Sequence, residues 1–231
     1  MPVIAELKAV TKIYGENTPV PVTALQGVSL TIEAGEFTAI AGPSGSGKTT
    51  LLNMIGALDR PTSGEVIVVG QRLNELNRNE RADFRLMHVG FIFQTYNLIP
   101  VLTAEENAEF VLLLRNIPEK ERREKVRAVL EEMGIGPELW HRRPAELSGG
   151  QQQRVAVARA LVAEPDLILA DEPTANLDSR TAGRLLDIMR EMNERHGATF
   201  VFSTHDPMVM ERARRLVRLR DGRIVSDETE V

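Results

Sequence analysis

The chain of 231 residues contains no cysteine. It can form no disulfide, offer no thiolate to a metal ion and use no cysteine nucleophile. Packing alone has to hold its fold, which suits a reducing compartment. Because 42% of the residues are hydrophobic, the chain can bury a sizeable core and build one domain or two small ones. This composition excludes a peptide hormone and a disordered tail.

Long apolar runs and a basic surplus are missing too. The longest apolar stretches, such as 51–58 and 167–170, are far shorter than the roughly 20 residues of a membrane-spanning helix. Residues 1–10 show no basic region followed by an apolar core, so no secretory signal is predicted. The net charge of −5 argues against general nucleic-acid binding. We expect a cytoplasmic protein.

Apolar periodicity predicts strands that alternate with helices. Strands are expected at 4–13, 28–32, 37–40, 65–69, 89–93, 167–170 and 199–203, and helices at 51–58 and 179–195. Such alternation implies a parallel sheet. The tail at 216–225, with Asp221-Gly222 between apolar positions, is predicted to be a small hairpin. From Gln94 to about residue 163 the pattern is helical instead, with helix starts near Thr103, Pro118 and Ser148.

One glycine-rich segment fits the phosphate-loop pattern G-x-x-x-x-G-K-[ST] between a predicted strand and a predicted helix. It consists of Gly42, Pro43, Ser44, Gly45, Ser46, Gly47, Lys48 and Thr49, followed by Thr50. The glycines let backbone N–H groups turn towards a phosphate, and the helix start adds positive charge. Lys48, one of only five lysines among 28 basic residues, would reach the β and γ oxygens, and Thr49 would bind Mg²⁺. A glycine-rich turn without a ligand is the alternative.

Two adjacent acids, Asp171 and Glu172, follow the apolar strand predicted at 167–170. Ligands of open α/β sheets bind at the carboxyl ends of the strands. Asp171 would hold the Mg²⁺ shell, and Glu172 would orient or deprotonate a water for attack on the γ-phosphate. Such a pair alone is as often part of an ordinary loop, but the phosphate loop favours the catalytic interpretation.

The segment Leu147-Ser148-Gly149-Gly150-Gln151 places a serine and two glycines at a predicted helix start. Its free N–H groups and hydroxyl would form a second anion site, and an ordinary capped helix is the alternative. With these motifs in this order, the chain resembles the ATP-binding cassette (ABC) ATPase family over essentially its whole length. The resemblance implies an α/β P-loop core with a mainly parallel sheet and an antiparallel β part. Residues 1–93 and 161–231 would form this core, and 94–160 an inserted helical signature subdomain.

The resemblance also implies roles for four further residues. Gln94 would touch Mg²⁺ and the attacking water, and His205 would contact the γ-phosphate. Asp178 would lie at a dimer seam, and Tyr14 would stack on adenine. A structural histidine, a plain turn and an edge-strand aromatic are the alternatives for the last three. Lys48, Gln94, Glu172 and His205 would then be the catalytic residues.

The implied partners are a second copy of the chain and a membrane permease. Ser148, Gly149, Gly150 and Gln151 of one subunit would close over the γ-phosphate held by the other, so that a head-to-tail homodimer encloses two ATP molecules with Mg²⁺. A separately encoded permease would dock beside Gln94 and 95–100. It would hold the chain at the inner face of the cytoplasmic membrane. No nucleic-acid partner is expected.

Within the family, residues 58–64, 147–160 and 172–178 resemble the branch of lipoprotein-releasing, macrolide-efflux and cell-division ATPases. Ala175 stands where that branch generally has glycine, and Met87-His88 is also atypical. A regulatory ATPase of the cell-division type and an ABC ATPase that acts on DNA or ribosomes are the alternatives. The arginine-rich tail, residues 212–223, is predicted to be a solvated face rather than a phospholipid or nucleic-acid patch.

Overall fold

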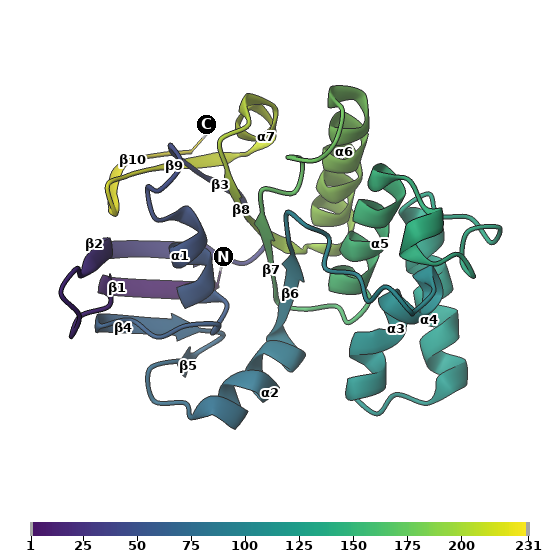
Figure 1. Ribbon diagram of the computed structural model, residues 1–231, viewed down its shortest axis with the longest axis horizontal. Coiled ribbons are helices and arrows are strands. Elements are labelled where there is room, and N and C mark those ends of the chain that lie inside the picture. Colours follow the sequence, from purple (N-terminus) through teal and green to yellow (C-terminus); the bar gives the residue numbers. More distant parts are fainter. Residues whose placement is uncertain (1, 230–231) are drawn as a thin grey trace.

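The computed structural model describes residues 2–229, whose strands form two sheets (Figure 1). The antiparallel sheet has the order β2-β1-β4-β5, with β1 at Val3–Tyr14, β2 at Val22–Glu33, β4 at Ser63–Val68 and β5 at Gln71–Arg72. The other sheet has the order β10-β9-β3-β8-β7-β6. Its strands are β3 at Phe37–Ala41, β6 at Val89–Ile92, β7 at Leu167–Asp171, β8 at Thr199–Thr204, β9 at Arg215–Arg220 and β10 at Arg223–Thr229. Only β10 pairs antiparallel in this sheet, so the predicted fold class is confirmed.

Two apolar clusters share the parallel sheet, because its central strands are buried on both faces. Ile40, Leu169 and Val201 face the first cluster, in which α1 (Lys48–Ile55) packs between the two sheets. Their neighbours along the strands face the second cluster. This alternation is the period of two that a strand imposes on its side chains.

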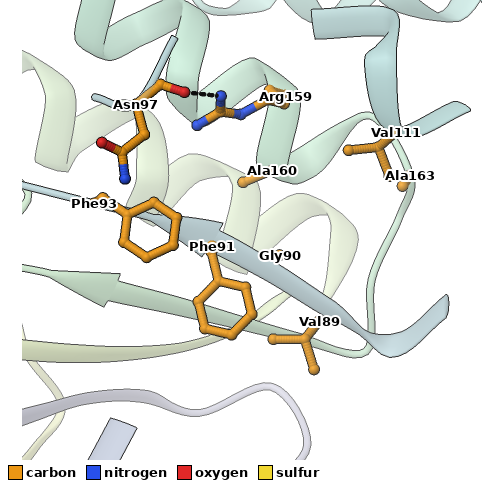
Figure 2. Close-up of a pocket in the computed structure, with 9 residues that line it drawn as sticks. All are labelled: Val89, Gly90, Phe91, Phe93, Asn97, Val111, Arg159, Ala160 and Ala163. Atoms are coloured by element: carbon orange, nitrogen blue, oxygen red, sulfur yellow. Dashed lines mark hydrogen bonds between the residues drawn. The ribbon is translucent and has the colours of Figure 1, made fainter. Parts of the chain in front are cut away.

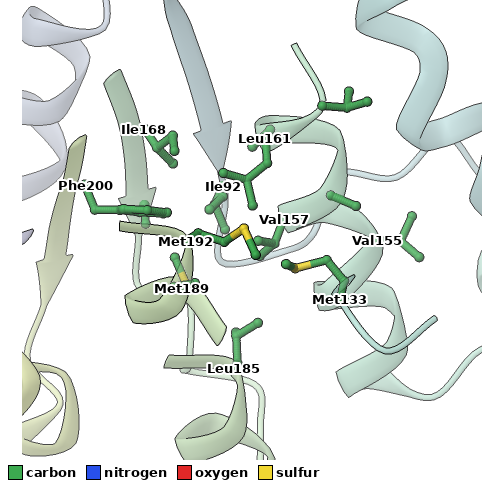
Figure 3. Close-up of a cluster of buried hydrophobic side chains, with 14 of the residues drawn as sticks. Ile92, Met133, Val155, Val157, Leu161, Ile168, Leu185, Met189, Met192 and Phe200 are labelled. Atoms are coloured by element: carbon green, nitrogen blue, oxygen red, sulfur yellow. The ribbon is translucent and has the colours of Figure 1, made fainter. Parts of the chain in front are cut away.

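The second cluster joins the parallel sheet to the helices drawn on the right of Figure 1. These are α3 (Ala104–Leu114), α4 (Glu119–Glu132), α5 (Gly149–Leu161) and α6 (Ser179–His196). Figure 3 shows Ile92, Ile168 and Phe200 of the sheet facing Val157 of α5 and Met189 of α6. The helices within 94–160 therefore share one core with α6 and the sheet. Among residues 2–229, no helix has the length and apolar content needed to cross a bilayer.

Several predicted boundaries were wrong, and three elements were missed. β2 begins at Val22 rather than at residue 28, and α1 ends at Ile55, which leaves Leu58 outside the helix. The missed elements are β5, α2 (Arg78–His88) and α7 (Pro207–Arg212). In α2 only Phe84 is buried and most residues are polar or charged, so little apolar sequence marks the helix. The tail hairpin is confirmed, with Asp221 and Gly222 both at positive φ in its turn.

Candidate active site

The strand β3 and the helix α1 hold the phosphate loop between them. The loop enters α1 at Gly47, whose φ of 103° favours glycine. A Cβ at this position would lie 2.5 Å from the carbonyl oxygen of Ala24. No side chain of residues 2–229 caps the start of α1, and its first turn carries no acidic residue. Its first N–H groups are therefore free to bind an anion.

Two polar side chains of the loop, those of Ser46 and Lys48, are buried. Lys48 is 7% exposed, and its Nζ donates to the carbonyl oxygens of Gly42 at 2.8 Å and Pro43 at 3.1 Å. Its third N–H is available to a phosphate oxygen. Ser46 is 2% exposed, and its hydroxyl has no hydrogen-bond partner within the described part of the chain. Ser46 does not line the pocket described below, so of these two side chains only Lys48 can reach a phosphate there.

Thr49 and Asp171 bring two oxygen ligands together at the mouth of the loop. The Thr49 hydroxyl donates to Asp171 Oδ1 at 3.1 Å, although the two residues lie on different elements. Residues 2–229 contain no group of three or more His, Cys, Asp or Glu side chains able to hold a metal. Mg²⁺ needs no such cage, because it is usually bound by one or two carboxylates together with water and substrate phosphates. The oxygen pair therefore fits Mg²⁺ bound with a nucleotide.

Glu172 follows β7 with a φ of 48° and is held from β8. Its backbone N–H donates to the carbonyl oxygen of Ser203 at 2.9 Å. His205 Nδ1 lies 2.7 Å from Glu172 Oε1, and the Thr204 hydroxyl lies 3.4 Å from Oε2. The carboxylate side chain is 14% exposed and the imidazole 67%. With Nδ1 directed at the carboxylate, the other ring nitrogen of His205 is left for a ligand.

One pocket of about 580 Å³ collects these groups, a size typical of small-molecule sites. Its lining residues come from β2, the phosphate loop and the ends of three parallel strands: Val22, Thr23, Ala24, Pro43, Ser44, Gly45, Gly47, Lys48, Thr49, Thr50, Gln94, Glu172 and His205. Tyr14 is outside this lining but pairs with Val22 at the end of β1. The structure therefore brings the predicted phosphate, water and γ-phosphate contacts to one place.

Comparison with known proteins decides the family. The sequence model described as ABC transporter matches residues 25–175. The chain belongs to the ABC transporter family. It is an ATP-binding cassette ATPase, so the resemblance seen in the motifs is confirmed.

Three relatives of this cassette illustrate the likeness. The chain is 49% identical over 226 residues to the macrolide export ATP-binding/permease protein MacB of Hyphomonas neptunium. The alignment covers 98% of the chain and 35% of that protein. It is 49% identical over 223 residues to the lipoprotein-releasing system ATP-binding protein LolD of Anaeromyxobacter dehalogenans, which covers 96% of the chain and 92% of that protein. The dimeric post-hydrolysis structure of the ATP-binding cassette MJ0796 bound to ADP and Pi superimposes with a TM-score of 0.91. Identity there is 42%, over 98% of both chains. The chain spans only about a third of the length of the macrolide export relative.

The segment 147–151, predicted to be a second anion site, does not line the pocket of its own chain. Ser148 caps α5, and Figure 1 shows this helix and α1 on opposite sides of β6 and β7. The Ser148 hydroxyl accepts from the Gln151 N–H at 3.3 Å, and the Gln151 side chain accepts from the Ser148 N–H at 2.8 Å. Asp178 caps α6 in a similar way. Hydrogen bonds from the side chain and backbone of Thr181 hold the pKa of Asp178 below its usual range.

A network that sequence reasoning missed holds the loop after Gln94. Arg159 of α5 donates to the carbonyl oxygens of Asn97 at 2.6 Å and Tyr96 at 2.9 Å. Asn176 Nδ2 donates to the Gln94 carbonyl oxygen at 2.7 Å. Burial lowers the pKa of the Arg159 guanidinium and raises that of the Tyr96 hydroxyl. The one signal available in the sequence was a single arginine within the apolar run of α5.

A second, smaller pocket of about 190 Å³ opens beside this loop (Figure 2). Its lining residues come from β6, the following loop, α3 and α5: Val89, Gly90, Phe91, Phe93, Asn97, Val111, Arg159, Ala160 and Ala163. Val101, which directly follows segment 95–100, is 70% exposed. Apolar surface therefore lies next to the segment that leads out of the ATP site.

Proposed function

We propose that this chain hydrolyses ATP to power a separately encoded permease of the lipoprotein-release or macrolide-efflux type. The observation that carries the proposal is the convergence of Lys48, Thr49, Glu172 and His205 on one pocket, with Asp171 hydrogen-bonded to Thr49. The names of the relatives support the type of permease.

Each side chain of the pocket has a separate task in this proposal. Lys48 and the N–H groups of the loop bind the β and γ phosphates. Thr49, Asp171 and Gln94 would hold Mg²⁺, which would neutralise charge on the transferred phosphoryl group. Glu172 takes the proton of the attacking water, and His205 fixes the Glu172 carboxylate while its other nitrogen faces the γ-phosphate.

A second copy of the chain completes the site. Ser148, Gly149, Gly150 and Gln151 lie too far from the pocket of their own chain to line it, and α5 offers N–H groups at its start. In a head-to-tail homodimer they would face the γ-phosphate of the partner copy, with Asp178 at the seam. The dimeric relative bound to ADP and Pi supports this assembly. ATP binding would close the dimer, and hydrolysis would reopen it.

The permease would dock at the pocket of Figure 2, beside Gln94 and 95–100. An apolar surface there suits a partner helix. Residues 94–160 would act as the helical subdomain that carries the motion between the ATP site and the permease. This docking would keep the chain at the inner face of the cytoplasmic membrane.

The arginines within residues 212–223 do not form a basic surface of the kind that binds nucleic acid. Each has an acidic or amide group beside it: Arg212 with Asp187, Arg214 with Glu194, Arg215 with Glu36 and Asp227, Arg218 with Glu228, Arg220 with Asp221, and Arg223 with Gln26. The region is therefore a mosaic of both charges rather than a phosphate-binding patch.

The test is the mass of the Glu172→Gln variant in solution with and without Mg-ATP. We expect it to bind ATP without turning it over, and so to shift from monomer to dimer. The double variant Glu172→Gln, Ser148→Phe should bind ATP but remain monomeric, since its lost contact lies between copies. Normal turnover by Glu172→Gln would refute the role of Glu172 as the base. Dimerisation of the double variant would refute the signature contact.

A further inference from the structure

The end of β1 carries a cluster around one lysine. Lys12 is largely buried, with 13% of its side chain exposed, and its Nζ donates to Asp59 Oδ1 and the Arg60 carbonyl oxygen, both at 2.8 Å. The same Nζ lies 4.8 Å from the centroid of the Tyr14 ring. Two hydrogen bonds and one aromatic face therefore engage the three N–H groups of the ammonium.

Asp59, which accepts from Lys12, is positioned by α1, the helix that follows the phosphate loop. After α1 ends, the N–H groups of Leu58 and Asp59 donate back to the Asn53 carbonyl oxygen at 2.9 and 3.2 Å. A few residues later the segment is hydrogen-bonded to β1, where the Ile13 N–H donates to the Thr62 hydroxyl at 3.0 Å. Segment 58–64 has no role in the proposed chemistry. It follows α1 in the chain, and its hydrogen bonds link that helix to β1, the strand that carries Tyr14.

We propose that Lys12 and Asp59 are positioning residues that fix the Tyr14 ring as the platform for the adenine base. This inference rests on the proposed ATP site and on the expectation that adenine stacks on Tyr14. Lys12 occupies one face of the ring, so a base can stack only on the other face. Tyr14 is 39% exposed, and its strand neighbour Val22 lines the pocket, so the ring lies beside the ATP site.

The physical advantage is preorganisation. A tyrosine at a strand end samples several rotamers, and stacking then costs the entropy of fixing one. A cation held under the ring face selects one orientation before the nucleotide arrives. Because α1 starts at the phosphate loop and ends next to Asp59, one helix sets the position of both phosphate and base.

The experiment measures binding of Mg-ADP and of Mg-pyrophosphate by calorimetry. Neither probe offers a γ-phosphate to hydrolyse, and pyrophosphate has no base. Lys12→Met keeps the length of the side chain. It should lower the affinity for Mg-ADP by about two- to fivefold, the range of an exposed cation–π contact. It should leave the affinity for Mg-pyrophosphate unchanged. Lys12→Arg should restore most of the lost Mg-ADP affinity. The control is Lys8→Met, on the same strand but 53% exposed, which should change neither affinity.

A double-mutant cycle separates positioning from a general effect. Tyr14→Ala should weaken Mg-ADP by about tenfold, in the range for loss of base–aromatic stacking. Adding Lys12→Met to Tyr14→Ala should then have no further effect. Three results would overturn the inference. Lys12→Met could lower Mg-ADP affinity equally with and without Tyr14→Ala, lower Mg-pyrophosphate affinity by the same factor, or lower neither affinity.

The failures are distinguishable. If Tyr14→Ala itself leaves Mg-ADP affinity unchanged, the proposed adenine stacking is wrong and the inference falls with it. If Tyr14→Ala weakens binding and Lys12→Met does not, only the inference is wrong. Should Lys12→Met fail to fold by circular dichroism, Asp59→Asn replaces it. That variant keeps the shape of the side chain and should weaken Mg-ADP, but not Mg-pyrophosphate, by less than the loss expected for Lys12→Met.

Discussion

Replacing Arg159 by methionine tests whether the arginine holds the loop after Gln94. Its guanidinium binds two carbonyl oxygens, those of Tyr96 and Asn97, and both residues have positive φ, at 58° and 50°. Left-handed backbone is unfavourable for both residues, and more so for tyrosine. The arginine therefore stabilises a loop conformation that the chain would not adopt alone.

The magnitude follows from these contacts. Two hydrogen bonds to a charged donor contribute about 3 kcal/mol together at the lower end of the measured range. Relaxation of the left-handed backbone at Tyr96 returns about 1 kcal/mol. We expect Arg159→Met to lower the free energy of unfolding by about 2 kcal/mol, which at this chain length is a fall in Tm of about 4–8 °C.

Urea unfolding and steady-state ATPase rates check this prediction together. The turnover number should fall because Gln94 loses its position, while Mg-ADP affinity should stay constant because the phosphate loop is untouched. Arg190→Met is the control, since within residues 2–229 Arg190 makes only an exposed pair with Glu194 one helical turn away. Wild-type stability and turnover in Arg159→Met would refute the reasoning.

Two further predictions concern stability. Phe202→Ala should lower the free energy of unfolding by about 3–5 kcal/mol in urea, because this fully buried ring packs against Phe37 and Phe200 and its loss leaves a cavity; a change below 1 kcal/mol would contradict the packing. Backbone and side-chain hydrogen bonds from Thr103 hold the pKa of Glu106 below its usual 4.5, so its contribution is present above that pH and is lost as the pH falls through the lowered pKa. Glu106→Gln should therefore be less stable than wild type at pH 7, with the gap closing towards pH 3, and a gap independent of pH would refute the assignment.

The strands of the parallel sheet were predictable because of where they lie. β3, β7 and β8 are buried on both faces, so the sequence there is a short continuous apolar run. The helix start predicted near Thr103 is equally local, and a capping box of Thr103 and Glu106 begins α3 there. In contrast, α2 buries one side chain, and most of its residues are polar or charged. Local signals thus predicted the elements whose burial or capping is encoded in neighbouring residues.

Two departures from the branch pattern also have structural explanations. Ala175 is absent from the residues with positive φ, so its methyl group is tolerated where relatives of the branch generally have glycine. His88 lies 2.7 Å from Asp166 and joins the start of β6 to the loop before β7. Neither residue lines the ATP pocket.

The sequence by itself determined the fold class, the family and the phosphate loop, because periodicity and a contiguous motif are properties of neighbouring residues. Only the tertiary structure decided that His205 binds the Glu172 carboxylate, that Arg159 holds the loop after Gln94, and that Lys12 lies under the Tyr14 ring. The first two contacts join elements far apart in the chain. In the third, the residues are neighbours on one strand, but Asp59 from beyond α1 holds the lysine in place. Their geometry comes from how strands and helices pack, which no local pattern encodes.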